Sequence, residues 1–156
     1  MAEIDSPREG ALSDPGLLRE MSVALLAELG ARRMYQRLAR WERDRELAQL
    51  LLGFEAEEQV QVRTLSKLIA DLGGKSKTSS LRRNLLADSL ALTTRCGMRR
   101  IVLRICAQAE DQRARWYMHF GEVLLQLGRP AQAQICGQLA LTKRRHALAL
   151  QAWVDN

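Results

Sequence analysis

The chain is poor in residues that interrupt helices and in those that hold small folds together. Only three prolines occur among 156 residues, and none lies between Pro15 and Pro130. Long helices are therefore allowed over most of the chain, because proline breaks helix interiors. The three cysteines (Cys96, Cys106 and Cys136) lack the paired spacing of a zinc site and the even count of a disulfide scaffold. We expect reduced, mostly buried thiols.

Long apolar runs are also missing. The longest, such as residues 50–52, fall far short of the roughly 20 residues that cross a bilayer, and no apolar signal segment precedes a cleavage site near the start. The chain is 47% hydrophobic and 27% charged, which is typical of one globular domain of this length. We therefore expect a soluble, cytoplasmic domain at residues 15–156, preceded by a flexible tail at residues 1–14.

The basic residues are unusual in kind, since 20 of the 24 are arginines. With a net charge of +6, this favours either an arginine-rich surface paired with the 18 acids or binding to nucleic acid or another polyanion. The arginines are spread along the whole chain, and aromatic residues make up only 4%, which leaves little surface for stacking on bases. This spread favours ion pairs and keeps polyanion binding as an alternative.

Apolar residues recur at three- and four-residue steps in four long segments, as in amphipathic helices. These segments span about residues 15–41, 47–72, 98–127 and 130–156. Short turns join the first to the second and the third to the fourth, which implies antiparallel neighbours. The connection between the second and third is long, and Ser80 can cap a short helix within it. The pattern predicts an all-α four-helix bundle with a long connection, containing a short helix, between helices 2 and 3.

Polar residues interrupt the core-facing stripe of every predicted helix near its middle. They are Glu28 on the first helix, Glu58 and Gln61 on the second, Glu110 on the third, and Lys143 and His146 on the fourth. An unpaired buried charge costs several kcal/mol, so each residue alone is expected to be solvated or hydrogen-bonded. All four helices carry the interruption at matching heights, however, which favours a shared polar layer inside the bundle.

This arrangement resembles the ferritin-like superfamily of carboxylate-bridged di-iron or di-manganese bundles. The family pattern is one glutamate from each of two helices and a Glu-x-x-His pair from each of the other two. Glu28 and Glu110 are similar to the single glutamates, and Glu28 is followed two turns later by Tyr35. The segment Glu58-Gln-Val-Gln61 resembles one Glu-x-x-His pair, and Lys143-Arg-Arg-His146 resembles the other. The resemblance covers about residues 17–154 and implies a ferritin-like bundle.

Two of the six positions depart from that pattern. Gln61 stands where a histidine ligand is expected, and Lys143 stands where a glutamate is expected. The lysine changes the local charge by two units, which opposes binding of two divalent metals. We expect Lys143 to pair with two of the glutamates in place of metal, and Gln61 to hydrogen-bond within the layer.

The main functional hypothesis is therefore a bundle with a degenerate di-iron site and no cofactor, acting as a structural or interaction protein that self-associates or binds a protein partner. The first alternative is an iron- or manganese-dependent oxidase or hydroxylase with an altered, mononuclear site built from Glu58, Glu110 and His146. Polyanion binding is the second alternative. The sequence leaves open whether the chain is an enzyme.

Overall fold

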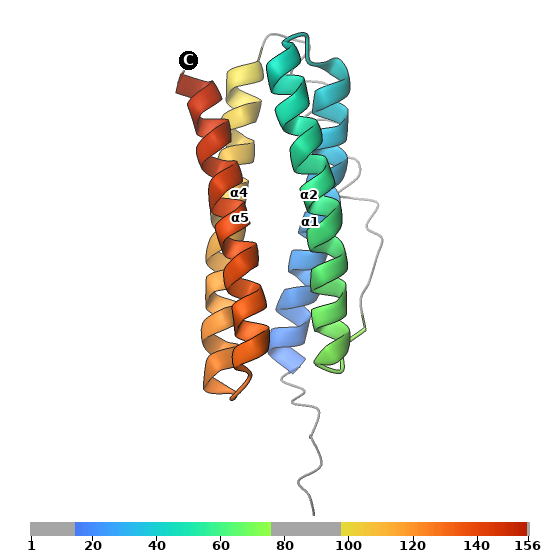
Figure 1. Ribbon diagram of the computed structural model, residues 1–156, viewed down its shortest axis with the longest axis vertical. Helices are drawn as coiled ribbons and strands as arrows, with labels where there is room; N and C mark the ends of the chain where they lie inside the picture. The colour runs from blue at the N-terminus through green and yellow to red at the C-terminus, as the bar shows by residue number, and fades with distance from the viewer. Residues whose placement is uncertain (1–14, 76–97, 156) are drawn as a thin grey trace, which may run out of the picture.

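A computed structural model describes residues 15–75 and 98–155. These residues form four long helices: α1 (Pro15–Trp41), α2 (Arg45–Asp71), α4 (Arg99–Gln126) and α5 (Pro130–Asp155). The expected all-α four-helix bundle is confirmed (Figure 1). The tail at 1–14, the short helix expected after Ser80, and Cys96 lie outside the described residues. No described helix is long and apolar enough to cross a membrane.

Local sequence sets the helix ends. Asp44 caps α2, because its carboxylate accepts hydrogen bonds from the backbone N–H groups of Glu46 and Leu47 at 2.9 and 3.2 Å. Gly73 and Gly128 end α2 and α4 in the left-handed region, with φ of 83° and 71°. These residues explain why the helix boundaries agree so closely with the sequence pattern.

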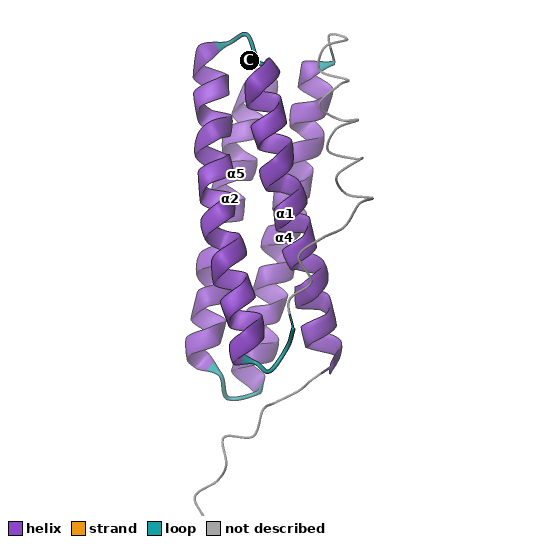
Figure 2. Ribbon diagram, turned by 90° about the vertical axis from the view of Figure 1, so that its right-hand side faces the viewer, coloured by secondary structure: helices purple, strands orange, loops and turns teal. Residues whose placement is uncertain are grey.

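The bundle consists of two antiparallel hairpins, α1/α2 and α4/α5 (Figures 1 and 2). Across the hairpins, α1 lies beside α4 and α2 lies beside α5, again antiparallel, so the diagonal pairs are parallel. The end of α2 and the start of α4 therefore lie at opposite ends of the bundle (Figure 1). This is the topology expected of a connection that returns along the bundle.

The backbones approach more closely within each hairpin than between them. Small residues at seven-residue steps explain this between α4 and α5. They are Ala107, Ala114 and Gly121 on α4, and Ala133, Ala140 and Ala147 on α5. A Cβ on Gly121 would lie 3.5 Å from the Ala133 carbonyl oxygen and 3.6 Å from the Cys136 Cβ, so nothing larger than a methyl group fits there.

The apolar core forms two clusters along the bundle. One contains Tyr35, Leu47, Leu51, Val102 and Leu150; the other contains Met21, Leu25, Leu65, Leu124 and Leu139. Cys106 and Cys136 are buried free thiols, one in each cluster, as expected. The residues between the two clusters are polar, and they form the candidate site.

Two glycine substitutions, one at the α4/α5 contact and one on the exposed face of α2, are expected to change stability in opposite directions. We expect Gly121→Leu to lower the free energy of unfolding by about 2 kcal/mol, because the added side chain has to push the helices apart. Gly53→Ala on α2 meets no atom within 4 Å and is expected to raise it by about 0.5–1 kcal/mol. Urea denaturation measures both. A neutral Gly121→Leu variant would show that the contact is looser than described.

Candidate functional site

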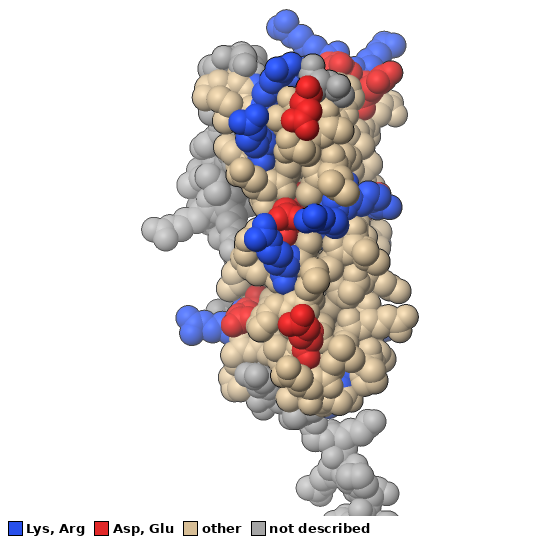
Figure 3. Space-filling model, turned by 90° about the vertical axis from the view of Figure 1, so that its left-hand side faces the viewer, with Lys and Arg blue, Asp and Glu red and all other residues tan. Residues whose placement is uncertain are grey.

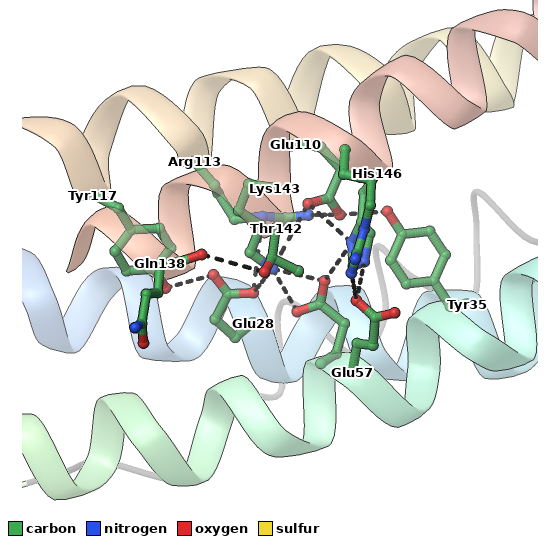
Figure 4. A network of polar contacts seen from close by, with 12 residues as sticks. Glu28, Tyr35, Glu57, Glu110, Arg113, Tyr117, Gln138, Thr142, Lys143 and His146 are labelled. Atoms are coloured by element: carbon green, nitrogen blue, oxygen red, sulfur yellow. Dashed lines mark hydrogen bonds and ion pairs between the residues drawn. The ribbon is translucent and has the colours of Figure 1, made fainter. Parts of the chain in front are cut away.

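The six polar residues expected in a shared layer are all buried. Glu28, Glu58, Glu110, Lys143 and His146 are fully buried, and Gln61 is 5% exposed. Each occupies a core-facing position of its helix, so the same periodicity that buries the leucines buries these charges. The layer lies at the middle of the bundle, where residues from all four helices meet (Figure 4).

The Lys143 ammonium group is the centre of the layer. Its Nζ donates to Glu28 and lies 2.6 Å from both carboxylate oxygens of Glu58. It lies 3.6 Å from Glu110 Oε2. One cation on α5 therefore pairs with acids from α1, α2 and α4. The expectation that Lys143 pairs with two of the glutamates is confirmed.

Arg113 supplies a second buried cation, which the sequence analysis missed. Its guanidinium donates to Glu110 one turn earlier on α4, and its Nε lies 4.0 Å from Glu28. The side chain is only 7% exposed. The helical spacing could have indicated its burial, because Arg113 lies on the buried stripe of α4 between Glu110 and Tyr117. Arginine normally extends its charge to solvent, and this tendency hides such a position.

Two buried tyrosines donate further hydrogen bonds to the glutamates. Tyr35 on α1 donates to Glu110, and Tyr117 on α4 donates to Glu28 at 2.5 Å. Each phenol lies at the edge of one apolar cluster, with its ring in the core and its hydroxyl in the layer. These hydrogen bonds join α1 to α4 in both directions.

His146 connects the layer to the surface. Its ring stacks on Phe54 with centroids 4.0 Å apart. Its Nε2 lies 2.9 Å from Glu57, a residue whose side chain is 42% exposed. Its Nδ1 lies 3.4 Å from Glu58 and 3.7 Å from Glu110. Glu57 also accepts from Arg145; as one of three nearby glutamates on α2, it was not distinguished by sequence.

Gln61 differs from its expected role. Its side chain is buried, but among the described residues neither its amide nitrogen nor its oxygen has a hydrogen-bond partner. The expectation that it hydrogen-bonds within the layer is therefore wrong. Glu58, one turn earlier on α2, accepts from Lys143 through both of its oxygens.

The layer shifts the pKa values of its groups in different directions. Burial would raise the pKa of Glu58, but its contact with Glu28 and the Lys143 charge lower it. Burial also opposes ionisation of Glu110, yet Arg113 and Lys143 lower its pKa. Burial and the Glu58 charge raise the pKa of Glu28 to about 8. Burial and the neighbouring Glu58 charge therefore favour the neutral form of Glu28 over its carboxylate.

The cations stay charged. Burial alone would lower the pKa of Lys143, but Glu28, Glu110 and Glu58 raise it. The same competition raises the pKa of His146 to about 9, through Glu110, Glu58 and Glu57. Lys143, Arg113 and His146 thus bring three cationic groups against the buried acids Glu28, Glu58 and Glu110.

The donor atoms of Glu58, Glu110 and His146 lie within 4.8 Å of one another, which is close enough to hold one metal ion. They do not fit that role in this arrangement. A metal would have to displace the Lys143 ammonium from both Glu58 oxygens and remove the proton from His146, because only neutral imidazole is a ligand. Two divalent ions would in addition need several carboxylates free of other cations, and here Lys143 and Arg113 pair with Glu28, Glu58 and Glu110.

Ion pairs also engage several of the surface arginines. Arg32 pairs with Glu55 at 3.0 Å, and Asp111 pairs with both Arg115 and Arg144. This supports the ion-pair interpretation of the arginine excess.

Comparisons with protein-family models, curated proteins and solved structures give no match to this chain.

The central position of Lys143 predicts a large effect of its removal. We expect Lys143→Met to lower the free energy of unfolding by about 3–5 kcal/mol, because it leaves buried carboxylates without their cation. Arg145→Ala, on the same helix but exposed, is the control and should change it by less than about 0.5 kcal/mol. Chemical denaturation at pH 7 compares them. Equal stabilities would contradict the pairing described above.

The pKa shifts predict a loss of stability at alkaline pH. The pKa of His146 is about 9 in the fold against 6.5 for a free histidine, so its proton stabilises the fold below pH 6.5 and this contribution is lost as the pH rises through 9. The proton of Glu28 also stabilises the fold, and this contribution is lost as the pH rises from 4.5 through about 8. We expect the His146 contribution to be on the order of 3 kcal/mol.

Urea denaturation between pH 6 and 9.5 measures this loss. His146→Gln removes one titrating group, so the variant should show a flatter dependence on pH over this range. The opposite slope, with stability rising from pH 6.5 to 9, would show that the folded layer does not retain these protons.

Proposed function

We propose that this chain is a ferritin-like bundle in which fixed cations have taken the place of a dinuclear metal centre, and that it acts as a structural or interaction protein. This proposal rests mainly on the position of the Lys143 ammonium, which lies among glutamate side chains from three other helices. In such a protein the layer fixes how the helices align with one another and carries out no redox chemistry.

The placement of the residues supports the ferritin-like assignment. Glu28 on α1 and Glu110 on α4 stand as single acids, whereas α2 and α5 carry the paired positions three residues apart. All lie in one buried layer, which is the arrangement that the family uses to hold two metals. The departures at Gln61 and Lys143 fall on two of those positions.

The charge balance supports the loss of metal chemistry. Two divalent ions need several negative ligands around them. Here Lys143 donates to Glu28 and Glu58, and Arg113 donates to Glu110. Both cations remain charged because the surrounding glutamates raise the pKa of each against the effect of burial. Entry of metal would place its charge beside two fixed cations.

A mononuclear metal-dependent oxidase is the second candidate, favoured by one observation. Glu58, Glu110 and His146 bring two carboxylates and one imidazole close together, a donor set that suits iron or manganese. This candidate requires Lys143 to turn out of the layer. The two proposals therefore differ in where the Lys143 ammonium lies when metal is supplied.

Metal analysis separates them. We expect the protein, purified after expression with added iron and manganese, to contain less than about 0.1 metal ion per chain, and its melting temperature to stay unchanged when ferrous iron or manganese is added, since nothing binds the folded state. His146→Ala should then alter stability alone. Two iron ions per chain with oxidase activity, or one ion that His146→Ala removes, would refute the proposal.

A further inference from the structure

The outer groove between α1 and α4 has an apolar floor. Near the start of α1, a cleft of about 500 Å³ is lined by Val23 of α1 and by Trp116 and Phe120 of α4. Ala109 and Ile105 precede Trp116 by seven and eleven residues, so they continue the same face of α4. Val23 is 42% exposed and Ile105 41%. An apolar strip therefore follows α4 from the cleft toward the start of the helix.

The chain leaves α2 and enters α4 beside α1. A Cβ on Gly74 would lie 3.0 Å from Leu18 Cδ2, near the start of α1, and Figure 2 shows the loop after α2 turning toward α1. At the other end of the bundle, the Arg99 guanidinium lies 3.5 Å from Glu42, directly after α1. The connection at residues 76–97 therefore has to cover the length of α1 between two points that both lie against this helix.

From these ends and this groove we propose that residues 81–92 of the same chain occupy the α1/α4 groove, with Leu81, Leu85 and Leu92 on its apolar floor. These leucines recur at steps of four and seven residues, which is the spacing of an amphipathic helix. The five residues on either side contain no leucine, isoleucine or valine, so residues 81–92 gain most from leaving water. This contact goes beyond the proposed function and does not depend on it.

The spacing of apolar residues matches on the two sides of the proposed contact. Leu81 and Leu92 are eleven residues apart, and so are Ile105 and Trp116; along a helix, both spacings correspond to a rise of roughly 16 Å. The connection runs from the end of α2 to the start of α4, which is opposite to the direction of α4 (Figure 1). Leu81 is therefore expected at Trp116, and Leu92 at Ile105.

The length of the connection fits this path. α4 has 28 residues and is roughly 42 Å long at 1.5 Å per residue. Twelve helical residues and ten extended ones reach about 50 Å. Little of this reach remains after the chain has crossed α1, so a connection of this length has to stay close to the bundle.

The alternative path, over α5, suits leucines less well. Figure 3 shows a band of charged side chains across the side of the molecule formed by α4 and α5. On these helices Asp111 pairs with both Arg115 and Arg144. A leucine-rich segment laid across these ion pairs would remove water from charged groups, which costs free energy. The α1/α4 groove offers the apolar surfaces of Trp116 and Ile105 in their place.

Tryptophan fluorescence of the full chain tests this contact. With the other two tryptophans replaced by phenylalanine, the emission reports Trp116 alone. The triple variant Leu81→Ser, Leu85→Ser, Leu92→Ser should shift this emission to longer wavelength and increase its quenching by acrylamide, because water then reaches the indole ring. Circular dichroism confirms that the variant is folded.

Two controls separate this contact from other effects. Leu86→Ser with Leu90→Ser removes leucines of the same segment that lie off the stripe, and should leave the Trp116 emission unchanged. A second reporter, Leu141→Trp with Trp116→Phe, places the tryptophan on the exposed face of α5. Its emission should not respond to the triple substitution, because the segment does not cross α5.

The chain without substitutions gives a further test by NMR. We expect nuclear Overhauser contacts between the indole protons of Trp116 and the methyl groups of Leu81. Their absence would overturn the proposal, as would an unchanged Trp116 emission in the triple variant, an equal shift in the off-stripe control, or a shift of the α5 reporter in its place. Metal content is measured separately, so the loss of this contact leaves the proposed function standing, and two iron ions per chain would refute that function without affecting the contact.

Discussion

The fold depends on one constraint, which is that charges removed from water have to be neutralised inside the bundle. Three glutamates enter the core from three helices, and the Lys143 ammonium on the fourth contacts all of them. Burial opposes ionisation of every group, yet the mutual contacts keep Glu58, Glu110 and Lys143 charged. Neither the acids nor the lysine can be buried alone, because an isolated buried ion costs far more than the fold can supply.

This constraint explains other features of the architecture. The hairpins pack closely within themselves and more loosely against each other, and the long polar side chains occupy the seam between them. The ring of Tyr35 packs in one apolar cluster and the ring of Tyr117 in the other, and both hydroxyls donate to glutamates of the layer. A sliding helix would separate several charge pairs at once. The layer thus specifies alignment, a role attested for buried polar groups in other helical assemblies.

The sequence predicted the helices and most of the layer because both follow from one periodicity. The spacing that places Leu25 and Leu139 in the core also places Glu28 and Lys143 there, so their convergence could be foreseen. Arg113 and Glu57 could not be foreseen in the same way. An arginine on a stripe normally reaches solvent, and the sequence does not distinguish Glu57, which contacts His146 and Arg145, from its acidic neighbours. The failure at Gln61 has a similar cause: periodicity predicts that the side chain is buried, but not whether its amide finds a hydrogen-bond partner.

The claim that a charged lysine closes the layer is tested most directly by nitrogen-15 NMR of the lysine side chains. Four lysines are present, and a Lys143→Arg variant assigns the signal. A buried ammonium held by two carboxylates exchanges its protons slowly with water, so the account predicts one protected ammonium resonance that persists unchanged when ferrous-iron mimics such as zinc are added. A Lys143 signal indistinguishable from those of the exposed lysines, or one that shifts to a solvent-exposed position on addition of metal, would contradict it.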